Sequence, residues 1–393
     1  MSTLLIKNLA EIVTGNEIIP KASVLIEEDK IAQVGHIHPK QADKVLDAEG
    51  KTLIPGFIDC HTHLVFAGSR DFELDMKLTG ARYSEIAQVG GINYTVNLTR
   101  KTSKEELFIQ ASKRLDTMLA HGTTTLEAKS GYGLDLATEI KILEVIQELD
   151  KKYPLDIIPT FMGAHAIPPG CTPSDYVKNI VDDMIPLVAE KKLARFCDVF
   201  CEKGYFSVEQ SQYILERGKH YGLVSKIHAD ELTPLGGAEL AAQVHAISAD
   251  HLLHVSNKGL RQMRIADVTA VLLPATPFAL MTGTYAPARR MLKEGVRVAL
   301  ATDLNPNCWT ESMQFIIQLA CYMMHMSPLE AIQAATRNAA YALGISDTVG
   351  TIEPGKKADM VLLDCPSHRF LPYHFGVNLV STVIKNGKII HSS

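Results

Sequence analysis

The stretch that decides the fold reads Leu53-Ile54-Pro55-Gly56-Phe57-Ile58-Asp59-Cys60-His61-Thr62-His63-Leu64. Its apolar run, broken by Pro-Gly, is typical of a short buried strand. Residues two apart on a strand project to the same face, so His61 and His63 should point the same way at the strand's end. Zinc and iron both accept imidazole nitrogen as a ligand. The stretch therefore predicts half of a metal site.

The composition is that of an ordinary globular protein. The chain has 393 residues, of which 46% are hydrophobic and 21% charged, which is enough material for a large core. A net charge of −5 without a basic run argues against a nucleic-acid partner. No apolar stretch approaches the length of a membrane span, and residues 1–13 lack the pattern of a secretory signal. The seven cysteines are scattered along the chain, which is typical of reduced thiols in a cytoplasmic protein. Together, these features lead us to expect a cytoplasmic protein that binds neither nucleic acid nor membranes.

Apolar, strand-like runs alternate with helical patterns through the middle of the chain. The runs cover residues 57–59, 123–127, 157–163, 194–200, 224–227, 246–249, 268–273 and 296–302. The clearest helical stretches cover residues 104–120, 137–152, 208–221 and 328–343. Eight strands with helical crossovers predict an α/β fold, a parallel (β/α)8 barrel of the TIM type. In that fold, functional groups gather at the C-terminal ends of the strands.

Both ends of the chain have a different character from the middle. Residues 3–52 contain short β-prone runs with turn signals at Gly15-Asn16 and Glu28-Asp29, and residues 383–390 form a predicted hairpin on Asn386-Gly387. We therefore expect one small β-sandwich domain built from residues 1–55 and 345–393. The barrel would then occupy residues 56–344.

Polar residues follow the predicted barrel strands where each one ends. Strand three is followed by His165, strand five by His228 and Glu231, strand six by His251, and strand eight by Asp303. A lone histidine is usually structural, but a set that recurs at barrel strand ends predicts an active site.

Two of these residues complete the metal site. With His61 and His63, the side chains of His228 and Asp303 give three nitrogens and one carboxylate oxygen, and leave room for a water whose pKa would fall to roughly 7. Glu231 could move a proton from that water to a leaving nitrogen. His251 could stabilise the developing oxyanion, so Glu231, His251 and Asp303 are the predicted catalytic residues.

The combination of these features resembles the amidohydrolase superfamily. The resemblance rests on the motif from Pro55 to His63, on the later histidine and aspartate, and on a β domain that the chain re-enters near residues 350–359. Further motifs are similar to one family within it, the imidazolonepropionases, and lie at residues 61–70, 127–133, 161–166, 228–231 and 303–306.

The resemblance implies a specific activity and site. Imidazolonepropionases hydrolyse 4-imidazolone-5-propanoate to N-formimidoyl-L-glutamate in histidine breakdown, with one divalent or trivalent metal ion, zinc or iron. The implied metal ligands are His61, His63, His228 and Asp303. The implied contacts to this small-molecule substrate are Arg70, Tyr132, His165, Glu231 and Asn305. Family members are commonly homodimers, so we expect a homodimer.

The chemistry of the substrate agrees with two of these positions. Arg70 can hold the propionate carboxylate through two parallel hydrogen bonds. Tyr132 lies between two glycines, whose permissive backbone allows a loop to approach a ligand closely.

One segment departs from the family pattern. After Asn305-Pro306 the family usually has small residues, whereas this chain has Asn307, Cys308 and Trp309. Asn307 can still offer its backbone N–H and its amide, and the Cys308 thiol is a weaker donor than a hydroxyl. We expect both residues to contact the ligand.

Three alternatives stay open at this point. The chain could be a related deaminase or cyclic amidohydrolase that acts on another small heterocycle, or a catalytically silent barrel that assembles other proteins. The superfamily also includes binuclear sites bridged by a lysine at the end of strand four. Here Lys203 follows Glu202 on the opposite face, which favours a single metal.

Overall fold

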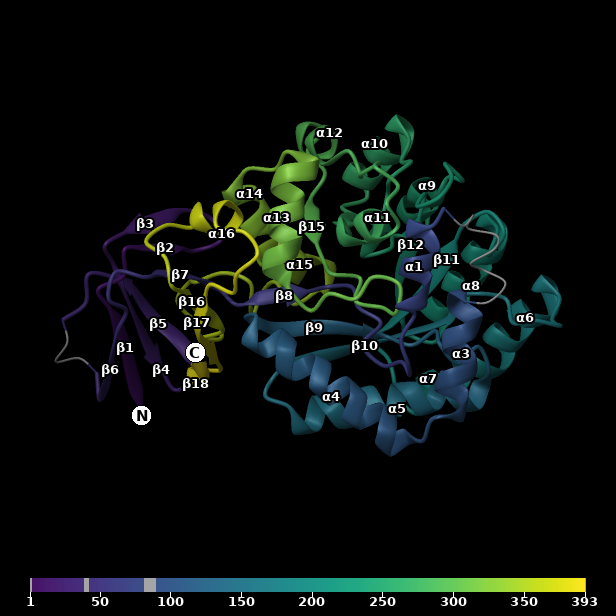
Figure 1. Cartoon of the computed structure of the whole chain (residues 1–393), viewed down its shortest axis with the longest axis horizontal. Helices are drawn as coiled ribbons and strands as arrows, with labels where there is room; N and C mark the ends of the chain where they lie inside the picture. The colour runs from purple at the N-terminus through teal and green to yellow at the C-terminus, as the bar shows by residue number, and fades with distance from the viewer. Residues whose placement is uncertain (1, 39–41, 81–89, 393) are drawn as a thin grey trace.

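The computed structural model describes residues 2–38, 42–80 and 90–392 (Figure 1). At its centre, eight parallel strands pair in chain order. They are β8 (Phe57–Asp59), β9 (Thr123–Lys129), β10 (Asp156–Ala164), β11 (Phe196–Cys201), β12 (Val224–Ala229), β13 (Ser248–His251), β14 (Thr269–Leu272) and β15 (Val298–Leu300). The predicted (β/α)8 barrel is confirmed. The sixth strand is shifted by two residues at both ends, since the predicted range is residues 246–249 and β13 covers Ser248–His251.

The first and last strands close the barrel through side chains and one bridge. Thr62 and Leu304 form an isolated parallel β-bridge just beyond the strand ends. Beneath it, the buried Asp59 carboxylate accepts hydrogen bonds from the Thr302 backbone N–H (3.0 Å) and from its hydroxyl (2.6 Å). This closure brings the segment after β8 and the segment after β15 side by side, although about 240 residues separate them in the chain.

Helices surround the barrel strands (Figure 1). They are α1 (Phe72–Leu78), α3 (Gly91–Lys101), α4 (Lys104–Ala120), α5 (Leu136–Lys152), α6 (Pro173–Asn179), the π-helix η2 (Ile180–Met184), α7 (Ile185–Glu190), α8 (Val208–His220), α9 (Gly237–Gln243), α10 (Asn257–Ile265), α11 (Ala275–Ala279), α12 (Ala288–Lys293), α13 (Met313–Met324), α14 (Pro328–Ala334) and α15 (Arg337–Ala342). The predicted helix 104–120 is α4, because the Ser103 hydroxyl accepts from the Glu106 N–H and starts the helix there.

The predicted helix over residues 328–343 is instead two helices, α14 and α15. Thr336 between them has φ −133° and ψ −90°, which is not helical. The carbonyl oxygen of Ala335 accepts a hydrogen bond from the N–H of Ile58 at 2.9 Å. A tertiary contact with the first barrel strand therefore replaces a helical bond, and no local propensity signals it.

Both chain ends build the terminal β-sheets, as predicted. One sheet has the order β5-β4-β1-β6 and the other β18-β17-β16-β7-β2-β3. Their elements are β1 (Thr3–Lys7), β2 (Glu11–Val13), β3 (Ile18–Pro20), β4 (Ser23–Glu27), β5 (Lys30–Gly35), β6 (Lys44–Asp47), β7 (Thr52–Pro55), β16 (Met360–Leu363), β17 (Val380–Lys385) and β18 (Lys388–Ser392), with the short helix α16 (Phe370–Tyr373) between β16 and β17.

The terminal sheets have a hydrophobic core of their own, in which Ile6, Val24 and Leu53 meet Met360 and Ile384. The hairpin on Asn386-Gly387 is confirmed, since both residues have positive φ (+48° and +74°). We propose that the domain boundaries lie at residues 55/56 and 344/345. Among the described residues, no helix is long and apolar enough to cross a membrane.

Candidate active site

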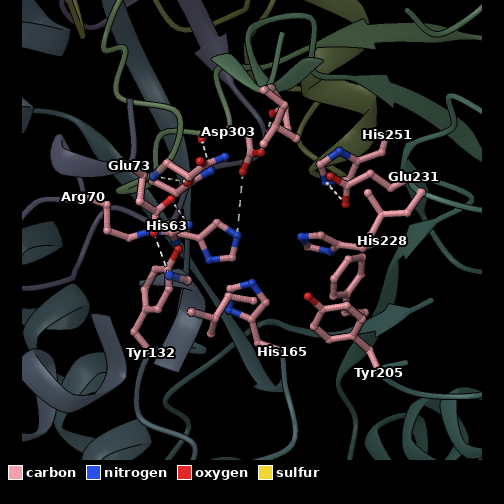
Figure 2. A pocket seen from close by; sticks show the side chains of 18 of the residues that line it. His63, Arg70, Glu73, Tyr132, His165, Tyr205, His228, Glu231, His251 and Asp303 are labelled. Carbon is pink, nitrogen blue, oxygen red and sulfur yellow. Dashed lines mark hydrogen bonds and ion pairs between the residues drawn. The ribbon is translucent and has the colours of Figure 1, made fainter. Parts of the chain in front are cut away.

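The candidate site is a pocket at the C-terminal ends of the barrel strands, where the sequence places it (Figure 2). The pocket has a volume of about 120 Å³. Ten of the predicted site residues line it: His63, Arg70, Tyr132, His165, His228, Glu231, His251, Asp303, Asn305 and Asn307. His61 lies fully buried beside His63. Cys308 is not among the lining residues.

The four predicted metal ligands come together around His61. Its Nε2 lies 3.5 Å from Asp303 Oδ1, and His63 Nε2 lies 3.8 Å from the same oxygen. The ring of His228 is 4.5 Å from the ring of His61. One nitrogen or oxygen of each of His61, His63 and Asp303 lies within 4.8 Å of the others, and the same holds for His61, His228 and His251.

Buried carboxylates orient two of these histidines. Asp250 Oδ2 accepts from His61 Nδ1 at 2.6 Å, and Asp198 Oδ1 accepts from His228 Nδ1 at 3.1 Å. Each bond fixes the tautomer that leaves Nε2 free. Carboxylates behind ligating histidines also raise their basicity and set the orientation of the ring.

A charged network below the histidines holds these carboxylates. The Lys129 ammonium lies 2.7 Å from Asp198 Oδ2, 2.9 Å from Glu127 Oε1 and 3.7 Å from Asp250 Oδ2. Lys226 donates to Glu127 Oε2 and to the Cys60 carbonyl oxygen, both at 3.0 Å. All five charged side chains are fully buried.

The buried lysines and carboxylates stabilise one another in their charged forms, and their net charge favours a cation beside the histidines. Burial alone would lower the pKa of Lys129, but the carboxylates of Asp198, Glu127 and Asp250 outweigh burial and raise it above its ordinary value. Two lysines against three carboxylates leave one negative charge beneath the histidines when all five groups are ionised. That charge complements a metal cation.

The histidine nitrogens that have no hydrogen-bond partner show whether these residues fit a metal ion. His61 Nε2 is buried and has no hydrogen-bond partner among the described residues. Burial holds the pKa of His61 and of His63 well below the ordinary value, so both rings are neutral, the form that binds a metal. A buried nitrogen without a partner is costly. A metal ion would satisfy it, and the residues therefore fit one.

Asp303 is positioned by the turn that follows β15. Its backbone is left-handed (φ +52°), its N–H donates to the His61 carbonyl oxygen at 3.0 Å, and its Oδ2 accepts from the Thr276 hydroxyl at 2.6 Å. The Asn305 side chain donates to the Asp303 carbonyl oxygen and accepts from the N–H groups of Asn307 and Cys308. In this structure the Asn305 amide therefore builds the turn, although it also lines the pocket.

Glu231 and His251 lie together on the side of the pocket opposite Arg70 and Tyr132 (Figure 2). Glu231 Oε2 is 3.6 Å from His251 Nε2. Burial raises the pKa of Glu231 to about 8, and the nearby Asp303 and Glu202 carboxylates add to the effect. The loop after Glu231 is anchored by Glu202, which accepts from the Leu232 N–H at 2.9 Å. Glu231 can therefore exchange a proton near neutral pH.

Tyr132 and His165 line the pocket beside His63. The His165 and His63 rings stack at 4.7 Å, with 12° between their planes, and the Tyr132 ring is 5.2 Å from His165. His165 Nδ1 donates to the Gly131 carbonyl oxygen at 3.0 Å, which leaves its Nε2 for a ligand. Burial lowers the pKa of His165 to about 3, so the ring is neutral.

The arginine predicted to hold the substrate carboxylate is already paired in part. Arg70 Nε and Nη2 donate to the two oxygens of Glu73 at 2.7 and 2.9 Å. Glu73 also accepts a hydrogen bond from the Gly91 N–H at 2.7 Å. Arg70 is thus held in place by one edge of its guanidinium, and Nη1, which has no hydrogen bond among the described residues, is available for a ligand.

The two residues that depart from the family pattern, Asn307 and Cys308, lie in different surroundings. Asn307 Oδ1 accepts from Lys77 Nζ at 2.8 Å, and both residues line the pocket. Cys308 instead belongs to the hydrophobic core, and its thiol lies 3.7 Å from the Thr302 carbonyl oxygen. This position supports a ligand contact by Asn307 and does not favour one by the Cys308 thiol.

Sequence reasoning did not assign the residues that support the site. These are Glu73, Lys77, Glu127, Lys129, Asp198, Tyr205, Lys226, Asp250 and Thr276. A signal was present for some of them. Asp198 and Lys226 are charged residues inside largely apolar strand runs, and a charge in the middle of such a run is almost never buried without a partner.

Comparison with known proteins places the chain in a family. The model described as the Amidohydrolase family matches residues 52–390. An imidazolonepropionase from Alkaliphilus oremlandii (strain OhILAs) is 52% identical over 88% of this chain and 83% of that protein. One from Shouchella clausii (strain KSM-K16) is 52% identical over 95% of this chain and 86% of that protein. A solved ochratoxinase from A. niger has a TM-score of 0.74 at 18% identity, over 100% of this chain and 96% of that one, which supports the fold alone. The chain belongs to the amidohydrolase family and, within it, to the imidazolonepropionases.

Proposed function

We propose that this chain hydrolyses the ring carbonyl–nitrogen bond of 4-imidazolone-5-propanoate and releases N-formimidoyl-L-glutamate, a step of histidine degradation. The observation that carries the proposal is a single pocket in which a cluster of histidines and one aspartate that could hold a metal lies between a buried glutamate and an arginine. A hydrolysable ring with an anionic tail needs these three elements together. The relatives named imidazolonepropionase support the choice of substrate.

The metal is proposed to lie between His61, His63, His228 and Asp303. When bound, it supplies a Lewis acid and lowers the pKa of a coordinated water to about 7. Three nitrogens and one carboxylate oxygen suit both zinc and iron. We propose one ion of either element. His251 also lies in the cluster, and we assign it to the reacting carbonyl rather than to the metal.

Proton transfer is assigned to Glu231. Water adds to the ring carbonyl carbon, the carbon–nitrogen bond breaks, and the nitrogen must gain a proton as it leaves. In its ionised form, Glu231 accepts the proton of the attacking water and returns it to that nitrogen, and Asp303 assists in proton handling. His251, 3.6 Å from Glu231, donates a hydrogen bond to the oxyanion that forms at the carbonyl.

The opposite side of the pocket is assigned to the substrate's tail and ring. Arg70 Nη1 binds the propionate, with the guanidinium held by Glu73. Tyr132 and His165 Nε2 contact the ring or its substituents. Asn305 and Asn307 contact the ligand from the turn after β15.

We also propose that the protein is a homodimer in the cytoplasm. Exposed aromatic and apolar side chains gather where α13 ends and around α16, and two of their rings, those of Tyr322 and Phe375, lie 6.0 Å apart. The patch consists of Tyr322, Met323, Phe370, Tyr373 and Phe375. Exposed apolar patches often mark interfaces. The dimer is tested by sedimentation of the wild type and of the Tyr373→Ser/Phe375→Ser variant, which should be a monomer.

The function is tested by supplying the proposed substrate to the purified protein. Loss of 4-imidazolone-5-propanoate is followed by its ultraviolet absorbance, the product is identified by mass spectrometry, and elemental analysis measures the metal. We expect N-formimidoyl-L-glutamate from metal-containing protein. If metal-loaded protein consumes none of this compound but releases ammonia from another heterocycle, the deaminase alternative replaces the proposal.

A further inference from the structure

The pocket wall opposite Glu231 carries two cations on one short segment. Arg70, Glu73 and Lys77 recur at a spacing of three and four residues, so they share one face of α1 and of the turn before it. All three line the pocket. Only Arg70 was expected to contact the substrate.

The first cation of this wall is neutralised. Glu73 is almost completely buried and receives three hydrogen bonds, two from Arg70 and one from the Gly91 N–H. Its negative charge is therefore fixed against the guanidinium. The pair positions Arg70 accurately but adds no net charge to the pocket.

The second cation, Lys77, is not neutralised in this way. Among the described residues, no carboxylate oxygen lies within 4.0 Å of Lys77 Nζ in an ion pair. Its hydrogen bond goes to a neutral acceptor, Asn307 Oδ1, at 2.8 Å. An ammonium group has three donors, so two stay available. The side chain is half-buried at the pocket's edge, where a charge interacts more strongly than in open water.

Asn307 gives this lysine a fixed position. A residue without a polar side chain at this point of the turn would offer the ammonium no side-chain acceptor. The departure at position 307 therefore has a structural role, which is to hold Lys77 against the pocket.

We propose that Lys77, held by Asn307, determines the preference for a carboxylate-bearing substrate by supplying the uncompensated positive charge of the pocket wall. The inference rests on the proposed function and deepens it. Arg70 fixes the direction of the substrate's tail through Nη1. Lys77 makes an anionic tail preferable to a neutral one of the same shape.

The test compares two substrates that differ in one group. The first is 4-imidazolone-5-propanoate and the second is its propionamide, which keeps the ring and the tail length. kcat and KM are measured for wild type, Lys77→Met, Lys77→Arg and Asn307→Ala, with Lys219→Met as the control. Lys219 is an exposed lysine on α8, away from the pocket.

Lys77→Met should raise KM for the acid about tenfold, because a charge-assisted hydrogen bond is lost. It should change kcat little and leave kcat/KM for the amide within about twofold. Lys77→Arg should keep the preference for the acid, Asn307→Ala should lose part of it, and Lys219→Met should behave like wild type.

An unchanged ratio of acid to amide kcat/KM in folded Lys77→Met overturns the inference while the proposed function stands. Should Lys77→Met fail to fold, an unchanged ratio in Asn307→Ala overturns it instead. If the wild type turns over neither compound, the proposed function fails and the inference fails with it.

Discussion

The bottom and the wall of the pocket differ in how their charges are held. The bottom is the buried network beneath the histidines, in which Lys129 and Lys226 lie with Glu127, Asp198 and Asp250 on barrel strands. None of the five is exposed or lines the pocket itself. The wall carries Arg70, Glu73 and Lys77 on a short helix and its preceding turn, partly open to solvent. Removing one partner of a buried charged network leaves the others uncompensated, whereas a charge at the edge can be changed alone.

The two regions therefore have different proposed roles. The bottom orients His61 and His228 through carboxylates that share one lysine, and we propose that it governs metal binding. No hydrogen bond or ion pair among the described residues joins the wall to either histidine, and we propose that the wall selects the tail that is bound. Changes at the bottom should therefore alter metal affinity or turnover, and changes in the wall should alter KM.

The largest effect is expected at the residue that moves the proton. Glu231→Gln keeps the size of the side chain but cannot accept a proton, so kcat should fall about 10²- to 10⁴-fold. Metal content, measured by elemental analysis of the same sample, should not change. Wild-type turnover by this variant would remove Glu231 from the mechanism.

The next largest effect is expected at the bottom of the pocket. Asp250→Asn keeps an oxygen near His61 Nδ1 but removes the charge that orients the ring, so metal affinity should fall about 10- to 100-fold. Competition with a chromophoric chelator measures the Kd. Asp347→Asn, at an exposed position, is the control. Equal metal affinities in the two variants would show that the Asp250 carboxylate does not influence metal binding by His61.

A smaller effect is expected in the wall. Arg70→Ala should raise KM about tenfold, because it removes a charge-assisted hydrogen bond and leaves Glu73 to repel the substrate's carboxylate. Adding Glu73→Gln should restore part of the affinity. Arg261→Ala, exposed on α10, should leave KM unchanged. If KM for Arg70→Ala is also unchanged, the tail is held elsewhere.

Much of the fold could be predicted because its signals are local. β8, which ends just before His61-Thr62-His63, lies in an apolar run with a Pro-Gly break, and α4 has a serine cap at its start. The break at Thr336 could not be predicted, since it depends on a bond between Ala335 and Ile58, which lies in another part of the chain.

The residues of the site likewise fall into those that could be predicted from the sequence and those that could not. Histidines and Asp303 at strand ends could be located, because the barrel brings the ends of distant strands together. The partners of these side chains could not be identified, since pairs such as Asp198 with His228 depend on strand register. Glu73 could not be foreseen as the partner of Arg70, because a surface pair three residues apart gives the same sequence pattern.

We propose that one metal ion, held between His61, His63, His228 and Asp303, is required for hydrolysis of the imidazolone ring. The most direct measurement removes the metal with a chelator and then follows turnover of 4-imidazolone-5-propanoate as zinc or iron is returned in steps. We predict no turnover without metal and a linear recovery that ends at one ion per chain. Full turnover by metal-free protein would show that hydrolysis needs no metal, and recovery that continues to two ions per chain would show a binuclear site.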